Sequence, residues 1–274
     1  MAATCYRHPD RETAVSCSSC GRPICPDCMT PTPVGMRCPE CMRQKTKVRG
    51  VGHGNQGFWR APATFVLIGL NVAAYLFEIA GGVGGINSPS FSSLNDFALR
   101  GTSVAGGEWY RLVTSGFLHA NLLHIGFNMF LLFILGRLLE PALGAPRFVT
   151  IYCASLLAGS FGALLLTDPI GLTYGASGAV FGLLGATFVI ARGRGMREIS
   201  GQIGFLIVIN LVFSFSDSHI SVGDHLGGLV AGVLCGLMTV AGERGMLGAR
   251  HRQAEFAAIA LVAAISVLGA LAVA

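Results

Sequence analysis

A serine and a histidine lie within otherwise apolar stretches of the sequence and could together perform acyl transfer. Ser177 stands in the motif Gly175–Gly178, and His225 opens a glycine-rich run that continues through Gly228. A serine hydroxyl becomes a nucleophile when a neighbouring base, most often histidine, takes its proton. Each residue alone also has a purely structural explanation, because serines bond back to their own membrane helix and small residues let helices pack closely.

His124 and Asn128 could supply hydrogen-bond donors to the same reaction. They are four residues apart in the sequence, so on a helix they share one face. The tetrahedral intermediate of acyl transfer carries an oxyanion that needs such donors, and the backbone N–H of Ser177 is a third candidate. His119 points about 140° away from His124 on a helix, and we expect it to serve the preceding loop.

Asp224 directly precedes the candidate base. Neighbouring residues on a helix diverge by about 100°, so we do not expect this carboxylate to orient the ring of His225. The sequence therefore predicts a Ser–His dyad without an acidic third member, and Asp224 is interpreted as a residue at the end of a loop.

A second set of reactive residues lies within the first 42 residues. It consists of four pairs, each with a two-residue gap: Cys5 and His8, Cys17 and Cys20, Cys25 and Cys28, and Cys38 and Cys41. A tight turn with this gap lets both side chains reach one tetrahedral ion, and eight ligands suit two structural zinc ions. A disulfide framework is the alternative, and it is disfavoured if this segment faces the reducing cytoplasm.

The spacing between these pairs indicates how they share the two ions. Only four residues separate the second pair from the third, which is short for a loop between two independent sites. This favours an interleaved arrangement, with Cys5, His8, Cys25 and Cys28 on one ion and Cys17, Cys20, Cys38 and Cys41 on the other.

The elements that must position the serine and the histidine are membrane spans. Charged residues make up 12% of the chain, and its mean hydropathy is +0.62; soluble domains carry about 25% charged residues. Seven apolar windows are predicted to cross a hydrocarbon core of about 30 Å, and the fifth of them is short. They are 63–80, 119–139, 148–167, 175–191, 202–216, 224–240 and 256–274.

Basic residues predict the orientation of these spans, because Lys and Arg favour cytoplasmic loops. The loops on one side hold Arg43, Lys45, Lys47, Arg49, Arg60, Arg137, Arg147, Arg192, Arg194, Arg197, Arg244, Arg250 and Arg252. The opposite loops hold Arg100 and Arg111 together with Asp96, Glu108, Asp168 and Asp217. We therefore expect a cytoplasmic amino terminus and an extracellular carboxyl terminus. His124, Asn128, Ser177 and His225 then lie at one shallow depth on the outer side.

The order and spacing of these motifs resemble those of the rhomboid proteases. The resemblance covers about residues 60–240 and rests on Glu108–Arg111, His119, His124, Asn128, Gly175–Gly178 and His225–Gly228. It implies an all-α polytopic membrane protein with a six-helix core, followed here by a seventh helix. It also implies that Ser177 is the nucleophile, His225 the base, and His124 and Asn128 the oxyanion donors. Trp109 and Arg111 match a structural loop, and Phe181 matches an aromatic residue that stacks on the catalytic histidine.

The cysteine-rich head is similar in its ligand spacing to the B-box zinc finger, which implies a module for protein contacts. About 40 residues cannot bury a large core, so metal binding would supply much of the folding energy. The head is only mildly basic, which disfavours nucleic acid as a partner. Binding of a protein partner, or self-association, is favoured instead.

Four segments follow from these interpretations: a zinc-binding head (1–42), a linker (43–60), a six-span catalytic domain (61–240), and a loop with the seventh helix (241–274). The predicted function is an intramembrane serine endopeptidase of the cell membrane that needs no cofactor for catalysis. It would hydrolyse peptide bonds in or near transmembrane segments of other membrane proteins in the lipid bilayer. An inactive relative that binds or escorts client membrane proteins is the alternative. A transporter would show internal repeats and midplane charges, and the sequence displays neither.

Overall fold

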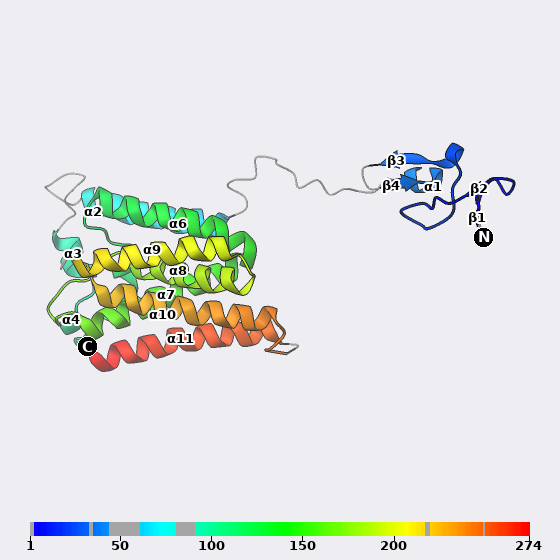
Figure 1. Cartoon of the computed structure of the whole chain (residues 1–274). Coiled ribbons are helices and arrows are strands. Elements are labelled where there is room, and N and C mark those ends of the chain that lie inside the picture. Colours follow the sequence, from blue (N-terminus) through cyan, green and yellow to red (C-terminus); the bar gives the residue numbers. More distant parts are fainter. Residues whose placement is uncertain (1–2, 33–34, 44–60, 81–90, 217–219, 249) are drawn as a thin grey trace. The chain divides into compact units, whose positions relative to one another are not determined.

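The computed structural model describes residues 3–32, 35–43, 61–80, 91–216, 220–248 and 250–274. The chain divides into two compact units, Met1–Asn55 and Gln56–Ala274 (Figure 1). Several residues used above to predict the linker and the orientation lie outside the described part: Lys45, Lys47, Arg49, Arg60 and Asp217.

The amino-terminal unit consists of short elements around a core of cysteines. Two antiparallel strand pairs form, β1 (Ala3–Thr4) with β2 (Glu12–Thr13) and β3 (Thr30–Thr32) with β4 (Gly35–Arg37). A 3-10 helix, η1 (Pro26–Cys28), precedes β3, and α1 (Pro39–Arg43) follows β4. The described core holds six cysteines and Ile24, and Tyr6 and Met29 pack against it. So few aliphatic side chains cannot stabilise a unit of this size by burial alone.

The second unit is a bundle of helices. Its elements are α2 (Pro62–Ala80), α3 (Phe91–Phe97), α4 (Gly101–Ala105), α5 (Arg111–Thr114), η3 (Ser115–Phe117), α6 (Leu122–Leu143), α7 (Ala145–Leu166), α8 (Ser177–Gly193), α9 (Arg197–Ser216), α10 (Val222–Glu243) and α11 (His251–Val273). In the described part of the chain, six helices are long and apolar enough to cross a membrane, and α8 is a shorter apolar helix. The predicted all-α, multi-spanning architecture with a final apolar helix is confirmed.

The seven predicted windows coincide with these helices and differ from them at their ends. The second window was expected to start at residue 119, but α6 begins at Leu122. Asn121 caps α6, because its side-chain oxygen accepts a hydrogen bond from the His124 N–H at 2.9 Å. The fifth window was expected to start at residue 202, whereas α9 already begins at Arg197 with polar residues.

The short helix α8 packs against α6, α7, α9 and α10. Glycines bring the backbones of α8 and α10 into contact. A Cβ built on Gly228 would lie 1.9 Å from the Gly178 carbonyl oxygen, and one built on Gly232 would lie 1.8 Å from that of Gly182. A side chain at Gly228 or Gly232 would push the helices apart. The first turns of α8 and α10, which carry Ser177 and His225, therefore meet closely.

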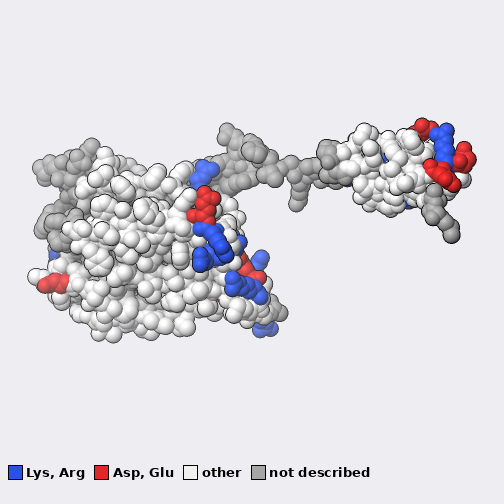
Figure 2. Space-filling model, viewed as in Figure 1, with Lys and Arg blue, Asp and Glu red and all other residues white. Residues whose placement is uncertain are grey.

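The outer helices bury little of their surface. Only 17% of the most apolar window of α9, and 17% of that of α11, is buried, against 56% for α7. Figure 2 shows that charged side chains on the visible face of this unit gather mainly near one end and leave a broad uncharged flank. That flank is the surface expected to face lipid.

A buried carboxylate joins α2 to α6. Glu140 on α6 accepts hydrogen bonds from the backbone N–H groups of Ala63 and Thr64, at 2.9 and 2.8 Å, and from the Thr64 hydroxyl at 2.7 Å. The first N–H groups of a helix have no partner within it. Glu140 therefore caps α2 from a neighbouring helix and fixes where α2 begins.

Candidate metal centres and candidate active site

The eight predicted ligands of the head gather into two groups of four. One group contains Cys5, His8, Cys25 and Cys28, and the other contains Cys17, Cys20, Cys38 and Cys41. Within each group, all ligand atoms lie within 4.8 Å of one another. Ligands bound to one tetrahedral zinc ion at about 2.3 Å lie about 3.8 Å apart. Both groups therefore fit a metal ion, in the interleaved arrangement that the sequence spacing favours.

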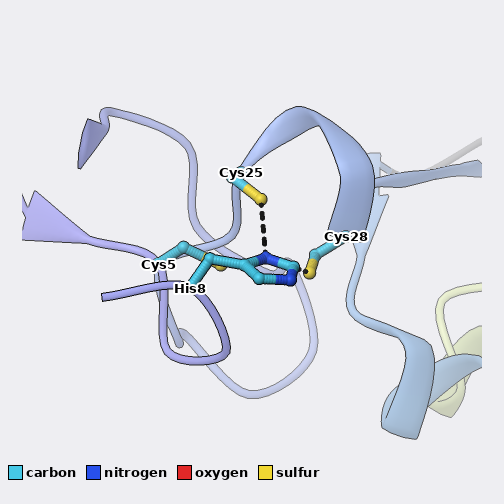
Figure 3. A group of neighbouring side chains, drawn as sticks. All are labelled: Cys5, His8, Cys25 and Cys28. Carbon is cyan, nitrogen blue, oxygen red and sulfur yellow. Dashed lines mark hydrogen bonds between the residues drawn. The ribbon is translucent and has the colours of Figure 1, made fainter. Parts of the chain in front are cut away.

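His8 faces the first group with its Nδ1 atom (Figure 3). That nitrogen lies 3.2 Å from the sulfur of Cys25, 3.5 Å from that of Cys28 and 3.9 Å from that of Cys5. Nδ1 is therefore the imidazole atom placed to bind an ion, a detail that the spacing of the sequence does not give.

A guanidinium group adjoins the second group. Arg22 Nε lies 3.3 Å from the Cys20 sulfur, and this contact lowers the pKa of the Cys20 thiol. The Cys38 N–H donates to the Cys17 sulfur at 3.3 Å and lowers the pKa of that thiol to about 6. Zinc binds thiolates rather than thiols, so both contacts favour the ligand form. The hydrogen bond with the Cys38 side chain raises the pKa of the Cys41 thiol to about 12, and burial of the thiol acts in the same direction.

In the membrane unit, Ser177 is the first residue of α8, and the chain approaches it through Gly175 at a φ of +134°. Residues with a side chain rarely adopt this conformation. A Cβ built on Gly175 would lie 2.9 Å from His124 Nε2 and 3.5 Å from Ser177 Oγ. The missing side chain thus leaves open the space next to both atoms, where a substrate carbonyl could sit.

His124 presents its Nε2 atom to this space as a donor. The Ala120 N–H donates to His124 Nδ1 at 3.3 Å. In a neutral imidazole, the nitrogen that accepts carries no proton, so the proton is on Nε2. Asn128 is buried one turn later, and one of its two amide protons is donated to the His124 carbonyl at 3.0 Å. Among the described residues, no hydrogen bond joins Asn128 to Ser177.

His119 lies in the turn before α6, as expected for a residue that serves this loop. Its backbone N–H donates to the buried carboxylate of Glu78 on α2 at 3.2 Å. Its ring packs edge-on against that of His124, with centroids 5.1 Å apart. The ring of His119 therefore packs against His124 and restricts its position. The backbone hydrogen bond of His119 to Glu78 connects the turn before α6 to α2.

His225 stacks on Phe181, which lies one turn after Ser177 on α8. The ring centroids are 4.1 Å apart, and the planes differ by 19°. His225 Nδ1 lies 2.6 Å from the Ser214 hydroxyl on α9. The structure thus brings His225 beside the helix that begins with Ser177, although no hydrogen bond joins the two residues in the described part of the chain.

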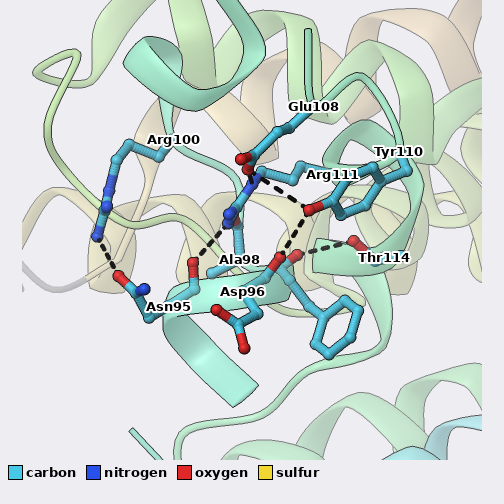
Figure 4. A network of polar contacts seen from close by, with 9 residues as sticks. Asn95, Asp96, Ala98, Arg100, Glu108, Tyr110, Arg111 and Thr114 are labelled. Carbon is cyan, nitrogen blue, oxygen red and sulfur yellow. Dashed lines mark hydrogen bonds and ion pairs between the residues drawn. The ribbon is translucent and has the colours of Figure 1, made fainter. Parts of the chain in front are cut away.

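A buried arginine holds together residues 95–111, which lie between α2 and α6. Arg111 donates from Nη1 to the carbonyl oxygens of Asn95 and Ala98, at 2.8 and 2.7 Å, and from Nε to Glu108 at 2.5 Å (Figure 4). Trp109 beside it is 65% exposed. Arg111 therefore organises the loop from inside, while Trp109 is free to contact lipid headgroups.

Comparison with known proteins assigns this unit to a family. A model of the rhomboid domain matches residues 106–242, which contain His124, Asn128, Ser177 and His225. The chain belongs to the rhomboid family. It is 34% identical over 192 residues to the rhomboid protease GluP of Bacillus subtilis, an alignment that covers 68% of this chain and 36% of GluP. It is 37% identical over 141 residues to the putative rhomboid protease YdcA of the same organism, covering 50% of this chain and 70% of YdcA.

The alignment to GluP spans only about a third of that relative's length. The rhomboid-domain match begins at residue 106 and ends at residue 242. It therefore includes α5, η3, α6 to α9 and α10 up to residue 242, and it leaves out α2, the cysteine-rich head and α11. The family match thus covers the helices that carry His124, Asn128, Ser177 and His225, and the alignment to GluP extends beyond it.

One residue of the rhomboid site differs from its prediction. Asp224 was interpreted as a loop-end residue, but it lies within α10, is 8% exposed, and accepts a hydrogen bond from Ser177 Oγ at 3.0 Å. Gly159 and Gly178 make room for it, because a Cβ on either would lie 2.5 Å from Asp224 Oδ1. Among the described residues, no hydrogen bond joins this carboxylate to the ring of His225, in line with the helix geometry, and its partner is Ser177 instead.

Proposed function

We propose that this rhomboid protein is an intramembrane serine endopeptidase with Ser177 as nucleophile and His225 as general base. The observation that carries the proposal is the arrangement around Gly175, where Ser177 Oγ and the donor His124 Nε2 border one open space. The stacking of His225 on Phe181, one turn from the nucleophile, supports the choice of base.

The reaction begins with a rotation of the Ser177 side chain from Asp224 towards His225. His225 Nε2 takes the hydroxyl proton while Ser177 Oγ attacks the peptide carbonyl carbon. The carbonyl oxygen becomes an oxyanion that accepts hydrogen bonds from His124 Nε2, from the free amide proton of Asn128 and from the Ser177 N–H. The imidazolium then gives its proton to the leaving amine as the C–N bond breaks. A water molecule hydrolyses the acyl-enzyme by the same steps.

Substrates of this activity are transmembrane segments of other proteins. The site is embedded in a bundle whose flank is apolar, so a peptide bond reaches it from the bilayer. To test the proposal, the purified protein is incubated with a single-span reporter in liposomes, and the products are analysed by mass spectrometry. Cuts within or next to the span support it, and cuts confined to soluble domains of the reporter oppose it.

An inactive rhomboid-like protein that binds or escorts client membrane proteins is the second candidate. The hydrogen bond of Ser177 to Asp224 favours this candidate. The Ser177 hydroxyl donates its proton to Asp224, whereas catalysis requires that His225 accept this proton. A fluorophosphonate probe, which phosphonylates activated serines, separates the two candidates. Labelling at Ser177 supports the protease, and unlabelled protein that still retains a client supports the escort.

We propose a cytoplasmic amino terminus and an extracellular carboxyl terminus. Ion pairs link the ends of several helices on one side, Arg147 with Glu255 at 2.9 Å and Arg194 with Glu243 at 2.5 Å. Basic ends favour the cytoplasm. Ser177 and His225 lie in the first turns of α8 and α10, away from the Arg194–Glu243 pair at the other ends of these helices, so the site opens outward. Cysteine labelling from outside the cell, at single cysteines introduced into each loop, tests this orientation.

We propose that the head binds two structural zinc ions and then contacts a protein partner. Three cysteines and one histidine in one group, and four cysteines in the other, are ligand sets typical of structural zinc. The ions would stabilise a unit whose described core is mostly sulfur. A pull-down tests whether the head binds a protein. The zinc-loaded full chain is compared with a variant of the full chain that lacks one of the two ligand groups.

A further inference from the structure

His225 has a partner outside the predicted site. Ser214, in the last turn of α9, places its Oγ 2.6 Å from His225 Nδ1. Both side chains are buried, with 2% of Ser214 and 7% of His225 exposed. A buried hydrogen bond of this length restrains both groups.

The direction of this hydrogen bond follows from the second bond of Ser214. A hydroxyl has one proton, and Ser214 donates it to the Asn210 carbonyl oxygen at 2.7 Å. The Ser214 oxygen must therefore accept from His225, which places a proton on Nδ1. A neutral imidazole protonated at Nδ1 has its lone pair on Nε2. Nε2 is the atom that must take the proton of the nucleophile.

We propose that Ser214 is a positioning residue for the base. It holds His225 in the tautomer that leaves Nε2 free, and together with Phe181 it fixes the plane of the ring. When His225 becomes an imidazolium, the Ser214 oxygen stabilises the Nδ1–H that faces it. In serine proteases with a triad this role belongs to a carboxylate; among the described residues, no carboxylate is hydrogen-bonded to the ring of His225.

The Asn210 carbonyl strengthens this role. It accepts the Ser214 proton and so polarises the hydroxyl, which makes the Ser214 oxygen a better acceptor for His225. The chain of bonds from Asn210 through Ser214 to His225 crosses from α9 to α10. The orientation of the base therefore depends on how α9 packs, whereas the nucleophile and the base themselves lie on α8 and α10.

The proposal rests on the proposed protease function, and three variants test it on a single-span reporter in liposomes. Ser214→Ala removes the acceptor, Ser214→Thr keeps a hydroxyl, and Ser216→Ala is the matched control. Ser216 lies on the same helix and makes the same type of bond, to the Val212 carbonyl at 2.8 Å, but it is exposed. We expect Ser214→Ala to lower kcat about 10- to 100-fold with KM nearly unchanged. Ser214→Thr should retain most of kcat, and Ser216→Ala all of it.

Two results overturn the proposal: a kcat of Ser214→Ala equal to that of Ser216→Ala, or a Ser214→Thr variant as slow as Ser214→Ala.

Nitrogen-15 NMR of the histidines of the full chain in detergent gives a readout that is independent of cleavage. The wild type should show His225 protonated at Nδ1, and Ser214→Ala should shift the tautomer towards Nε2. A wild type that lacks cleavage but shows this tautomer contradicts the protease function alone. A wild type protonated at Nε2 contradicts the role of Ser214.

Discussion

The Ser177 hydroxyl donates its proton to Asp224 Oδ2 over 3.0 Å, and Asp224 is the residue that directly precedes the candidate base. One hydroxyl proton serves one strong acceptor at a time. The Ser177 hydroxyl is therefore engaged by Asp224 in this structure. In the proposed mechanism it must leave this partner before His225 can activate it.

Replacing Asp224 with alanine should make Ser177 more reactive. The variant loses the hydrogen bond from Ser177 Oγ to Asp224 Oδ2, which is worth about 0.5–1.5 kcal/mol, and the hydroxyl can then turn to His225. We expect the rate of fluorophosphonate labelling at Ser177 to rise about 10-fold. Asp224→Asn keeps the shape with a weaker acceptor and should fall between the wild type and the alanine variant. Slower labelling of Asp224→Ala than of the wild type would show that the carboxylate assists the nucleophile.

A methyl group at Gly232 should separate α8 from α10. Its Cβ would lie 1.8 Å from the Gly182 carbonyl oxygen, and such overpacking costs about 1–3 kcal/mol. Gly232→Ala should therefore lower the midpoint of thermal unfolding in detergent and reduce cleavage. Gly201→Ala on α9 is the control, because nothing lies within 4 Å of a Cβ at that position. Equal midpoints for the two variants would contradict the backbone contact between the helices.

Loss of Glu140 should release the start of α2. Its carboxylate satisfies the N–H groups of Ala63 and Thr64 and the Thr64 hydroxyl, and each buried donor left without a partner costs about 1–3 kcal/mol. We expect Glu140→Ala to unfold at a clearly lower temperature, with faster hydrogen exchange at the first turn of α2. The exposed Glu198 on α9 provides the control: Glu198→Ala should unfold as the wild type does, and an unchanged Glu140→Ala would refute the cap.

The two metal centres should lose their ions one at a time. The wild type is expected to carry two zinc ions per chain by elemental analysis. Cys28→Ser should leave about one, and so should Cys38→Ser, because each variant breaks a different group. Cys153 lies on α7 outside both groups, so Cys153→Ser should keep both ions. A wild type that holds no zinc in reducing buffer would refute the metal assignment, and loss of both ions from either variant would refute two independent centres.

Much of the membrane unit could be predicted from the sequence, because long apolar windows can satisfy their backbone only as helices. The late start of α6 was missed, although Asn121 stands three residues before His124 as an N-cap residue does. The wrong interpretation of Asp224 has a different cause. The angle between neighbouring residues on one helix predicts that the Asp224 side chain does not contact His225. It does not predict which other helices the side chain meets. Gly159 on α7 and Gly178 on α8 leave the space that the carboxylate occupies.

Ser214 carries no signal in the sequence at all. Serines that bond back to their own helix are common in membrane proteins, and Ser214, Ser216 and Ser266 all do so. Only the packing of α9 against α10 distinguishes the first of these from the others. The roles of His8 Nδ1 and of Arg22 likewise depend on how the short elements of the head fold around its sulfur core.

Cleavage of a fluorescent single-span substrate in liposomes tests the central claim most directly. The wild type is compared with Ser177→Ala and His225→Ala, after all three have been shown to unfold at similar temperatures. The Ser–His mechanism predicts that the wild type cleaves and that both variants fall to the level of protein-free liposomes. Cleavage at equal rates by all three proteins would contradict it.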